Sequence, residues 1–181
     1  MRKLLISFLF MFGIFNTATA NYSSLVYNFE FNGIDGKEIK LSNYKNKVLV
    51  IVNVASRCGY TPQYDGLQKL WSNYKDKGLV VIGVPTNNFK QEPGTNKEIK
   101  DFCQANFNIN FPMTEKTSVI GNNAHPFYKW AKDNHGMGAI PKWNFHKIVV
   151  GKNGKVVDTF ASFTKPSSKK FIKFIEKEIK N

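Results

Sequence analysis

The sequence has few of the residues that cross-link small folds or bind metal ions, with two cysteines and three histidines among 181 residues. These numbers exclude a small fold built on several disulfides, and they are too low for a zinc ribbon. Arginine is equally scarce, because only Arg2 and Arg57 of the 26 basic residues are arginine. Specific recognition of phosphates and bases relies mainly on the planar arginine side chain, so we expect no nucleic-acid partner.

The chain is instead rich in aromatic residues and in lysine. Aromatic side chains make up 14% of the sequence, which excludes a disordered chain, and the length fits a single domain. The net charge of +13 comes from lysines spread along the chain. We interpret them as a solvent-exposed surface that makes at most weak contact with an anionic membrane surface. Their densest group lies on the polar side of a C-terminal segment: Lys169, Lys170, Lys173, Lys177 and Lys180.

The N-terminal segment has the features of a secretory signal peptide. Two basic residues precede an uncharged apolar run over residues 4–15, and residues 18–20 (ATA) match a cleavage site. The run is too short to span a membrane, because about 12 residues rise only about 18 Å as a helix against a hydrocarbon core of about 30 Å. We therefore predict a signal peptide over residues 1–20, a mature domain over residues 21–181, and a periplasmic or secreted location. An uncleaved N-terminal anchor is the alternative.

The apolar pattern of the first half predicts alternating strands and helices. Residues 25–31 and 38–41 flank a turn that contains glycine and aspartate, which predicts an opening hairpin. Residues 48–54 (VLVIVNV) and 79–84 (LVVIGV) have the continuous apolar character of strands buried on both faces. A helix predicted over residues 61–77 joins them, which implies a parallel pair with a right-handed crossover.

The second half adds two helices, a hairpin and a terminal helix. Residues 95–98 (TNKE) form a capping-box pattern that begins a helix, and another short helix is predicted over residues 125–133. Strands over residues 145–150 and 155–160 enclose an Asn-Gly turn, and an amphipathic helix over residues 167–180 ends the chain. This order is that of a thioredoxin-like α/β sandwich, with a central mixed sheet flanked by helices and an added N-terminal β-hairpin.

Cys58 lies between a predicted strand and a predicted helix, for which Thr61 is the expected N-cap and Pro62 the first helical residue. Sheets of this class place their sites at this end of a strand, and the dipole of a helix N-terminus stabilises a thiolate. Residues 58–62 (CGYTP) are similar to the C-x-x-C-P loop of thioredoxins, with threonine in place of the second cysteine. Taken alone, the pattern also fits a small buried cysteine under a turn.

Four separated segments together resemble the glutathione peroxidase family. Residues 53–64 (NVASRCGYTPQY) are similar to the segment around the family's active cysteine or selenocysteine, and residues 77–85 (KGLVVIGVP) to its next strand. Residues 91–94 (QEPG) and 143–145 (WNF) match two further motifs in the same order. The resemblance extends from about Tyr27 to the C-terminus. It implies a monomeric enzyme that reduces hydrogen peroxide and organic or lipid hydroperoxides to water and alcohols without a metal, flavin or haem.

The resemblance also implies roles for individual residues. The Cys58 thiolate would attack the peroxide and become a sulfenic acid, assisted by the indole N–H of Trp143 and the amide of Asn144. The position of the family's catalytic glutamine is occupied by Asn88, in a loop one residue shorter. Asn88 keeps an amide donor but loses a methylene of reach, and it fits a simple turn equally well. Gln91 is the second candidate for this role.

Cys103 lies in a segment, FCQANF over residues 102–107, that resembles the resolving-cysteine segment of the family's thiol-peroxidase branch. This likeness implies a disulfide between oxidised Cys58 and Cys103, with a thioredoxin-like protein or glutathione as the reductant. A permanent structural disulfide is the alternative, because exported proteins commonly contain one. A redox-active bridge requires local unwinding of the helix, since the two Cα atoms must approach within about 7 Å.

Two other functions remain compatible with the sequence. A thioredoxin-like thiol–disulfide exchanger or peroxide sensor would use Cys58 for fast thiol exchange and would turn peroxide over slowly. A lysine-rich binding protein with a vestigial site would bind anionic surfaces in a salt-sensitive way and would have no peroxidase activity.

Overall fold

The computed structural model describes residues 24–181, so the predicted signal peptide lies outside the described residues. The centre of the molecule is a four-stranded sheet in which β3 and β4 are parallel and β5 is antiparallel to both β3 and β6. The sheet is therefore mixed, as the sequence predicts. Its strands, in spatial order, are β4 (Leu79–Pro85), β3 (Val48–Val54), β5 (Lys147–Val150) and β6 (Val156–Phe160).

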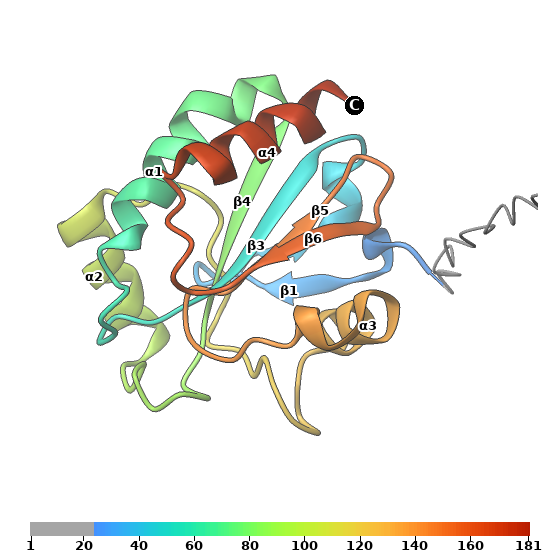
Figure 1. Cartoon of the computed structure of the whole chain (residues 1–181). Helices are drawn as coiled ribbons and strands as arrows, with labels where there is room; N and C mark the ends of the chain where they lie inside the picture. The colour runs from blue at the N-terminus through green and yellow to red at the C-terminus, as the bar shows by residue number, and fades with distance from the viewer. Residues whose placement is uncertain (1–23) are drawn as a thin grey trace, which may run out of the picture.

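Helices cover both faces of this sheet (Figure 1), and β3 shows why. All seven residues of β3 are buried, so each face of the strand needs an apolar partner. Val50 and its same-face neighbours pack in one core cluster with residues of the first, second and fourth helices, whereas Leu49 and Ile51 pack in another with residues of the third. The helices are α1 (Gln63–Tyr74), α2 (Asn96–Phe107), α3 (Pro126–His135) and α4 (Lys169–Lys180).

The predicted N-terminal hairpin is present as a separate two-stranded sheet. Its strands β1 (Glu30–Asn32) and β2 (Glu38–Lys40) pair antiparallel, with Phe31 opposite Ile39. Phe31 is buried in the same cluster as the α3 side chains, so the hairpin packs on that side of the central sheet. Short 3-10 helices complete the fold: η1 (Val26–Asn28), η2 (Leu41–Tyr44), η3 (Lys75–Lys77) and η4 (Gly136–Ala139).

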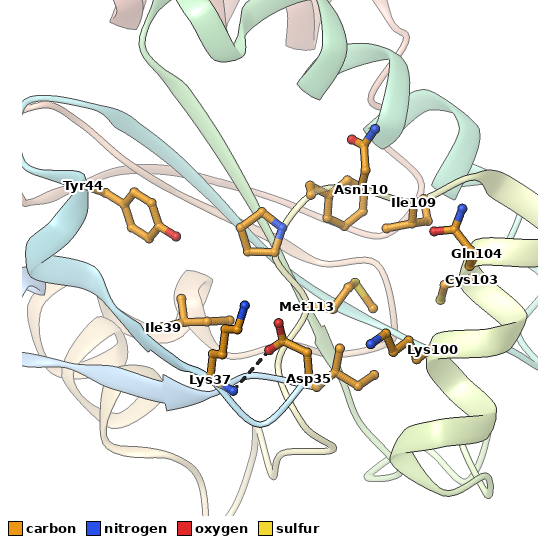
Figure 2. Close-up of a pocket in the computed structure, with 13 residues that line it drawn as sticks. Asp35, Lys37, Ile39, Tyr44, Lys100, Cys103, Gln104, Ile109, Asn110 and Met113 are labelled. Atoms are coloured by element: carbon orange, nitrogen blue, oxygen red, sulfur yellow. Dashed lines mark hydrogen bonds between the residues drawn. The ribbon is translucent and has the colours of Figure 1, made fainter.

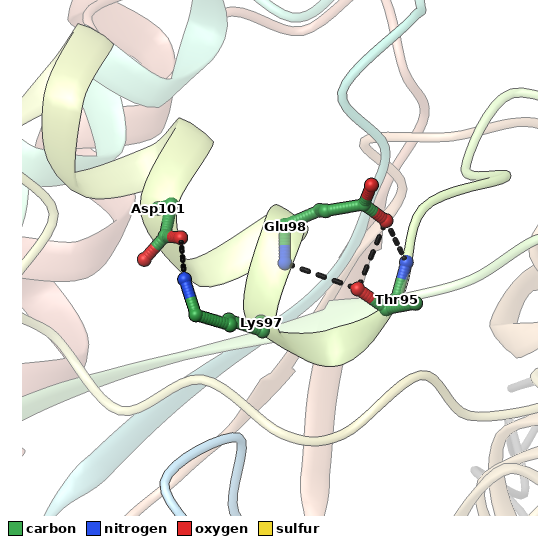
Figure 3. Close-up of polar contacts among 4 residues, drawn as sticks. All are labelled: Thr95, Lys97, Glu98 and Asp101. Carbon is green, nitrogen blue, oxygen red and sulfur yellow. Dashed lines mark hydrogen bonds and ion pairs between the residues drawn. The ribbon is translucent and has the colours of Figure 1, made fainter.

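The capping box predicted at the start of α2 is confirmed (Figure 3). The Thr95 hydroxyl accepts a hydrogen bond from the Glu98 N–H at 3.3 Å, and the Glu98 carboxylate accepts one from the Thr95 N–H at 2.7 Å. One turn further on, Lys97 and Asp101 form an exposed ion pair at 2.6 Å. Such pairs contribute little, so the cap is the main local determinant of where α2 begins.

The start of α1 differs from the prediction. Its N-cap is Pro62, and the expected cap at Thr61 is wrong. The Thr61 hydroxyl instead donates to the Ala55 carbonyl at 2.9 Å and accepts from the Cys58 N–H at 3.0 Å. The threonine therefore closes the loop that carries Cys58 rather than the helix. At its other end α1 continues into η3, and Gly78 ends this segment with a left-handed φ of 100°, which glycine adopts without strain.

The C-terminal helix matches its amphipathic pattern. Phe171 and Ile175 are buried against the sheet, whereas the five lysines of α4 are exposed. These lysines therefore form a solvated surface, as predicted. None of the helices in the described part of the chain is long and apolar enough to cross a membrane.

Candidate active site

Three segments meet at one end of the central sheet. They are the loop after β3 that contains Cys58, the loop after β4, and the turn before β5 that contains Trp143 and Asn144. The first two are held together where Thr86 donates its N–H to the Val54 carbonyl at 3.1 Å. β3 and β4 are parallel, so their carboxyl ends share one edge, and the antiparallel β5 begins at that same edge.

Cys58 lies in a compact turn immediately before α1 and is a free thiol with 8% of its surface exposed. Its sulfur accepts a hydrogen bond from the Tyr60 N–H at 3.4 Å, and its own N–H is held by Thr61. A backbone donor at the sulfur and the nearby helix N-terminus both stabilise negative charge there. The turn therefore holds the sulfur of the candidate nucleophile beside a backbone donor.

Trp143 and Asn144 are fixed next to this loop through Asn53, near the end of β3. The Asn53 amide donates to the Trp143 carbonyl at 3.1 Å, and the Asn53 carbonyl accepts from the Phe145 N–H. These two contacts clamp the backbone on either side of Asn144, whose side chain is buried. The Trp143 ring remains 41% exposed and packs against Phe89, with ring centroids 5.4 Å apart. The WNF motif is thus held at the same edge of the sheet as the loop after β3.

The two candidate amides of the β4 loop make different contacts. The Asn88 side-chain oxygen accepts hydrogen bonds from the Val119 N–H at 2.7 Å and from the Thr86 hydroxyl at 2.9 Å. The Gln91 side-chain oxygen accepts from the Asn144 amide at 2.9 Å. Among the described residues, therefore, the Gln91 side chain contacts a predicted site residue, whereas the Asn88 side chain anchors its loop to Ser118 and Val119.

Glu92 supports the Cys58 loop, a role that its place in the QEPG motif alone does not indicate. It is 1% exposed, and its carboxylate accepts from both the N–H and the hydroxyl of Ser56, at 2.8 and 3.0 Å. Burial raises the pKa of Glu92, although the two bonds from Ser56 oppose this shift. Glu92 therefore fixes the loop that carries Cys58 through its two hydrogen bonds with Ser56. The position of the QEPG motif between two site segments is the signal that could have indicated such a role.

Cys103 lies on the inner face of α2, is free, and is only 2% exposed. Burial raises the pKa of its thiol to about 11, partly offset by the nearby Tyr64 hydroxyl. Cys103 also lines a cavity of about 350 Å³, to which α2 contributes Lys100 and the hairpin contributes Asp35 and Lys37 (Figure 2). Cys58 and Cys103 belong to the same core cluster, on the same face of the sheet.

Lys147 is an exception to the expectation of solvated lysines. It is fully buried on β5 and donates to the Gln63 side-chain oxygen at 2.6 Å and to the Thr164 carbonyl at 2.7 Å. Burial lowers the pKa of Lys147 to about 7. The lysine joins the start of α1 to the segment before α4, so its contacts are structural. No group of His, Cys, Asp and Glu side chains suited to a metal ion occurs in residues 24–181.

The chain is similar to known proteins of one family. A family model described as glutathione peroxidase matches residues 26–132. Hydroperoxy fatty acid reductase of Synechocystis is 44% identical over 157 residues, which cover 82% of this chain and 93% of that protein. Glutathione peroxidase-like peroxiredoxin 2 of Saccharomyces cerevisiae is 47% identical over 147 residues, covering 78% and 90% respectively.

A solved structure supports the same assignment. The crystal structure of T. cruzi GPX1 superposes with a TM-score of 0.67 at 31% identity, and the match covers 87% of this chain and 98% of that one. Thiol:disulfide interchange proteins of the thioredoxin family also superpose, for example one from Chlorobium tepidum with a TM-score of 0.64 at 13% identity. At that identity the likeness shows a thioredoxin-like fold alone.

Proposed function

The chain belongs to the glutathione peroxidase family and is a thiol-dependent peroxidase, and we propose that Cys58 is the thiol that reacts with the hydroperoxide. The observation that supports this proposal is the position of Cys58: a backbone N–H donates to its sulfur, and Gln91 links its loop to Asn144 through hydrogen bonds to the Arg57 N–H and the Asn144 amide. Trp143 and Asn144 are the proposed donors.

The proposed reaction is a displacement at oxygen. The Cys58 thiolate attacks the terminal oxygen of the hydroperoxide, an S–O bond forms and the O–O bond breaks. Cys58 becomes a sulfenic acid, and the departing oxygen takes up a proton to leave as water or an alcohol. Negative charge develops on the departing oxygen, and the N–H groups of Trp143 and Asn144 are the donors proposed to stabilise it.

A direct measurement of Cys58 oxidation tests the assignment. Reduced protein is mixed with hydrogen peroxide in a stopped-flow instrument, and the sulfenic acid is trapped with dimedone and located by peptide mass spectrometry. Cys58→Ser is expected to abolish the reaction, because a hydroxyl without a dedicated base is a poor nucleophile. Cys103→Ser is the matched control, since it removes the other thiol. Retention of near-normal turnover by Cys58→Ser, with native circular dichroism, would refute the role.

Cys103 is the proposed resolving residue. Its thiolate attacks the sulfur of the Cys58 sulfenic acid, an S–S bond forms, and the oxygen leaves as water after protonation. A thioredoxin-like dithiol then reduces the bridge and becomes a disulfide itself, and glutathione is the alternative reductant. Both cysteines are free thiols in the structure, as this cycle requires of its resting state. The peroxiredoxin-like relatives support a thioredoxin-like reductant.

An apolar rim beside Cys58 supports organic and lipid hydroperoxides as substrates. A cavity of about 490 Å³ adjoins the Cys58 loop and is lined by Tyr60, by Phe163 and by two lysines, Lys69 and Lys165. Phe163 is 73% exposed, so it can cover an acyl chain, and the lysines can pair with a carboxylate. The printed name of the Synechocystis relative points to the same substrate class.

The substrate proposal has its own test. Phe163→Ser should lower the rate with a fatty-acid hydroperoxide by about 5-fold, the effect of about 1 kcal/mol of lost apolar contact, and leave the rate with hydrogen peroxide unchanged. Met137→Ser is the control, because Met137 is also exposed but lies on η4, away from this cavity. If Phe163→Ser lowered the rates with the fatty-acid hydroperoxide and with hydrogen peroxide equally, Phe163 would not contribute to binding of the lipid substrate.

A thiol–disulfide exchanger is the rival activity within the same fold. Exchangers with a C-x-x-C loop use a second cysteine three residues after the first. Here that position is Thr61, whose hydroxyl is already engaged by the Cys58 N–H and the Ala55 carbonyl. Fast reduction of a disulfide substrate together with slow peroxide turnover would favour this rival.

We also propose that the protein is exported and acts as a monomer. The basis for export is the pattern of residues 1–20, and the mature chain should begin at Asn21. Intact mass spectrometry of the protein from its native host tests cleavage, and retention of the leader would indicate an anchor instead. Sedimentation at several concentrations tests the monomer.

A further inference from the structure

The loop after β4 places Gln91 between the Cys58 loop and Asn144. The Gln91 carbonyl accepts a hydrogen bond from the N–H of Arg57 at 3.1 Å, and Arg57 directly precedes Cys58. The Gln91 side-chain oxygen accepts from the Asn144 amide nitrogen at 2.9 Å. A single residue therefore joins the backbone beside the reactive cysteine to a proposed donor of the site.

The neighbouring residue reinforces this connection. Glu92 binds the N–H and hydroxyl of Ser56, so Gln91 and Glu92 together hold Ser56 and Arg57, the two residues before Cys58. The Glu92 N–H is in turn fixed by the Asn87 side chain at 3.1 Å. The Gln91 carbonyl and the N–H of the next residue, Glu92, are thus both held by hydrogen bonds, and the Gln91 residue is half-buried.

The turn that precedes Gln91 explains how it reaches the site. Lys90 donates its N–H to the Asn87 carbonyl at 3.0 Å and adopts a left-handed φ of 57°, so the chain reverses within four residues. Left-handed backbone costs energy for a residue other than glycine, and the contacts of residues 91 and 92 offset it. Because the chain reverses here, the side chain of Asn88 is directed toward Val119 and the side chain of Gln91 toward Asn144.

We propose that Gln91 is the positioning residue for Asn144 in the reaction of Cys58 with hydroperoxide. The proposal rests on the proposed function of Cys58. Asn144 is clamped through its neighbours' backbone by Asn53, but its amide is oriented by Gln91, which accepts one of its two N–H hydrogens. The amide group is planar, so this contact also sets the direction of the second N–H of Asn144, which is the one proposed to stabilise the departing oxygen. Loss of the acceptor leaves the amide free to rotate away from the departing oxygen.

The experiment compares two reactions of the same thiol. In Gln91→Leu the rate constant for Cys58 oxidation by hydrogen peroxide should fall by about 10-fold or more, the scale of losing one well-placed donor. Alkylation of Cys58 by iodoacetamide should change less than about 3-fold, because that reaction has no departing oxygen to stabilise. Gln104→Leu, an exposed glutamine on α2, is the matched control. Gln91→Met, which keeps the length of glutamine, gives the same test if the leucine variant does not fold.

A double-mutant cycle identifies the route of the effect. If Gln91 acts through Asn144, adding Gln91→Leu to Asn144→Ala should slow peroxide oxidation no further. Independent, multiplying effects would overturn the proposal, as would equal slowing of oxidation and alkylation. A rate loss in Asn88→Ala that is absent in Gln91→Leu would also overturn the proposal and would favour Asn88 as the amide of this loop that assists Cys58. Failure of Cys58 to react with peroxide in the unmodified protein would instead refute the proposed function itself.

Discussion

The two cysteines share one core cluster, yet their surroundings suit them to different steps. Cys58 lies in a loop at the end of a strand, with a backbone N–H directed at its sulfur. Cys103 lies in the third turn of a helix, 2% exposed, with the pKa of its thiol raised to about 11 by burial. Nearness in the fold therefore does not make two thiols equivalent, because the backbone around each decides when it can react.

Because Cys103 is only 2% exposed, we predict that its reaction with oxidised Cys58 requires part of α2 to open. The Cys103 carbonyl accepts from the N–H groups of Asn108 and Ile109, so Cys103 takes part in the hydrogen bonds that end the helix. At the other end the Thr95–Glu98 capping box holds the first turn. Opening removes the thiol from its apolar surroundings and returns its pKa toward the usual value, which favours the reactive thiolate.

The largest effect that would test this contrast is loss of turnover in Cys103→Ser. The first equivalent of peroxide should still react, because Cys58 is unchanged, but turnover with a thioredoxin-like dithiol should fail. Excess peroxide should then drive Cys58 to the sulfinic or sulfonic acid, which peptide mass spectrometry detects. Full dithiol-dependent turnover of this variant would mean that an external thiol resolves the sulfenic acid and that Cys103 has a structural role.

A second prediction concerns the ionisation of Cys103. In Cys58→Ser only Cys103 can react, and at pH 8 its alkylation by iodoacetamide should be at least about 100-fold slower than in the denatured protein, since two pKa units reduce the thiolate fraction that much. The rate should rise about 10-fold per pH unit up to about pH 10, because the folded thiol loses its proton near pH 11. Equal rates in folded and denatured protein would contradict the buried environment.

A third prediction uses the helix caps to change the opening of α2 alone. Thr95→Ala should destabilise the first turn of α2 by about 1 kcal/mol and speed formation of the Cys58–Cys103 disulfide after peroxide by about 5-fold. Ser168→Ala is the matched control, because the Ser168 hydroxyl also accepts a hydrogen bond at its helix N-terminus, from the Phe171 N–H, and α4 carries no cysteine. The disulfide is followed by quenching with acid and mass spectrometry. An identical rate in both variants would show that opening of α2 does not limit resolution.

The smallest expected effect comes from the contact between Tyr64 and Cys103. The Tyr64 hydroxyl is buried without a nitrogen or oxygen partner in the described part of the chain, and it lowers the pKa of Cys103 against the larger effect of burial. Tyr64→Phe should slow alkylation of Cys103 by less than about 3-fold and change the stability by about 1 kcal/mol at most, since an unsatisfied hydroxyl is removed. A large loss of stability would indicate that this hydroxyl makes a stronger bond.

Sequence periodicity was sufficient for most of the fold. The uninterrupted apolar runs of β3 and β4 allow only strands buried on both faces, and the Thr95 and Glu98 spacing located α2, because these signals are local. The prediction that Thr61 is the N-cap of α1 is wrong for a tertiary reason. Thr61 has the right side chain for an N-cap, but the Cys58 loop offers its hydroxyl two partners, and tertiary contacts outweighed the local preference.

The sequence by itself determined the thioredoxin-like order of elements, the family resemblance and the candidate residues Cys58, Cys103, Trp143 and Asn144. Only the tertiary structure decided which amide of the β4 loop meets Asn144. Asn88 and Gln91 are three residues apart, and the direction of each side chain depends on the tight turn at Lys90 and on partners distant in sequence, Val119 for one and Asn144 for the other. Such contacts between remote segments follow from the packing of the whole chain, so no local pattern encodes them.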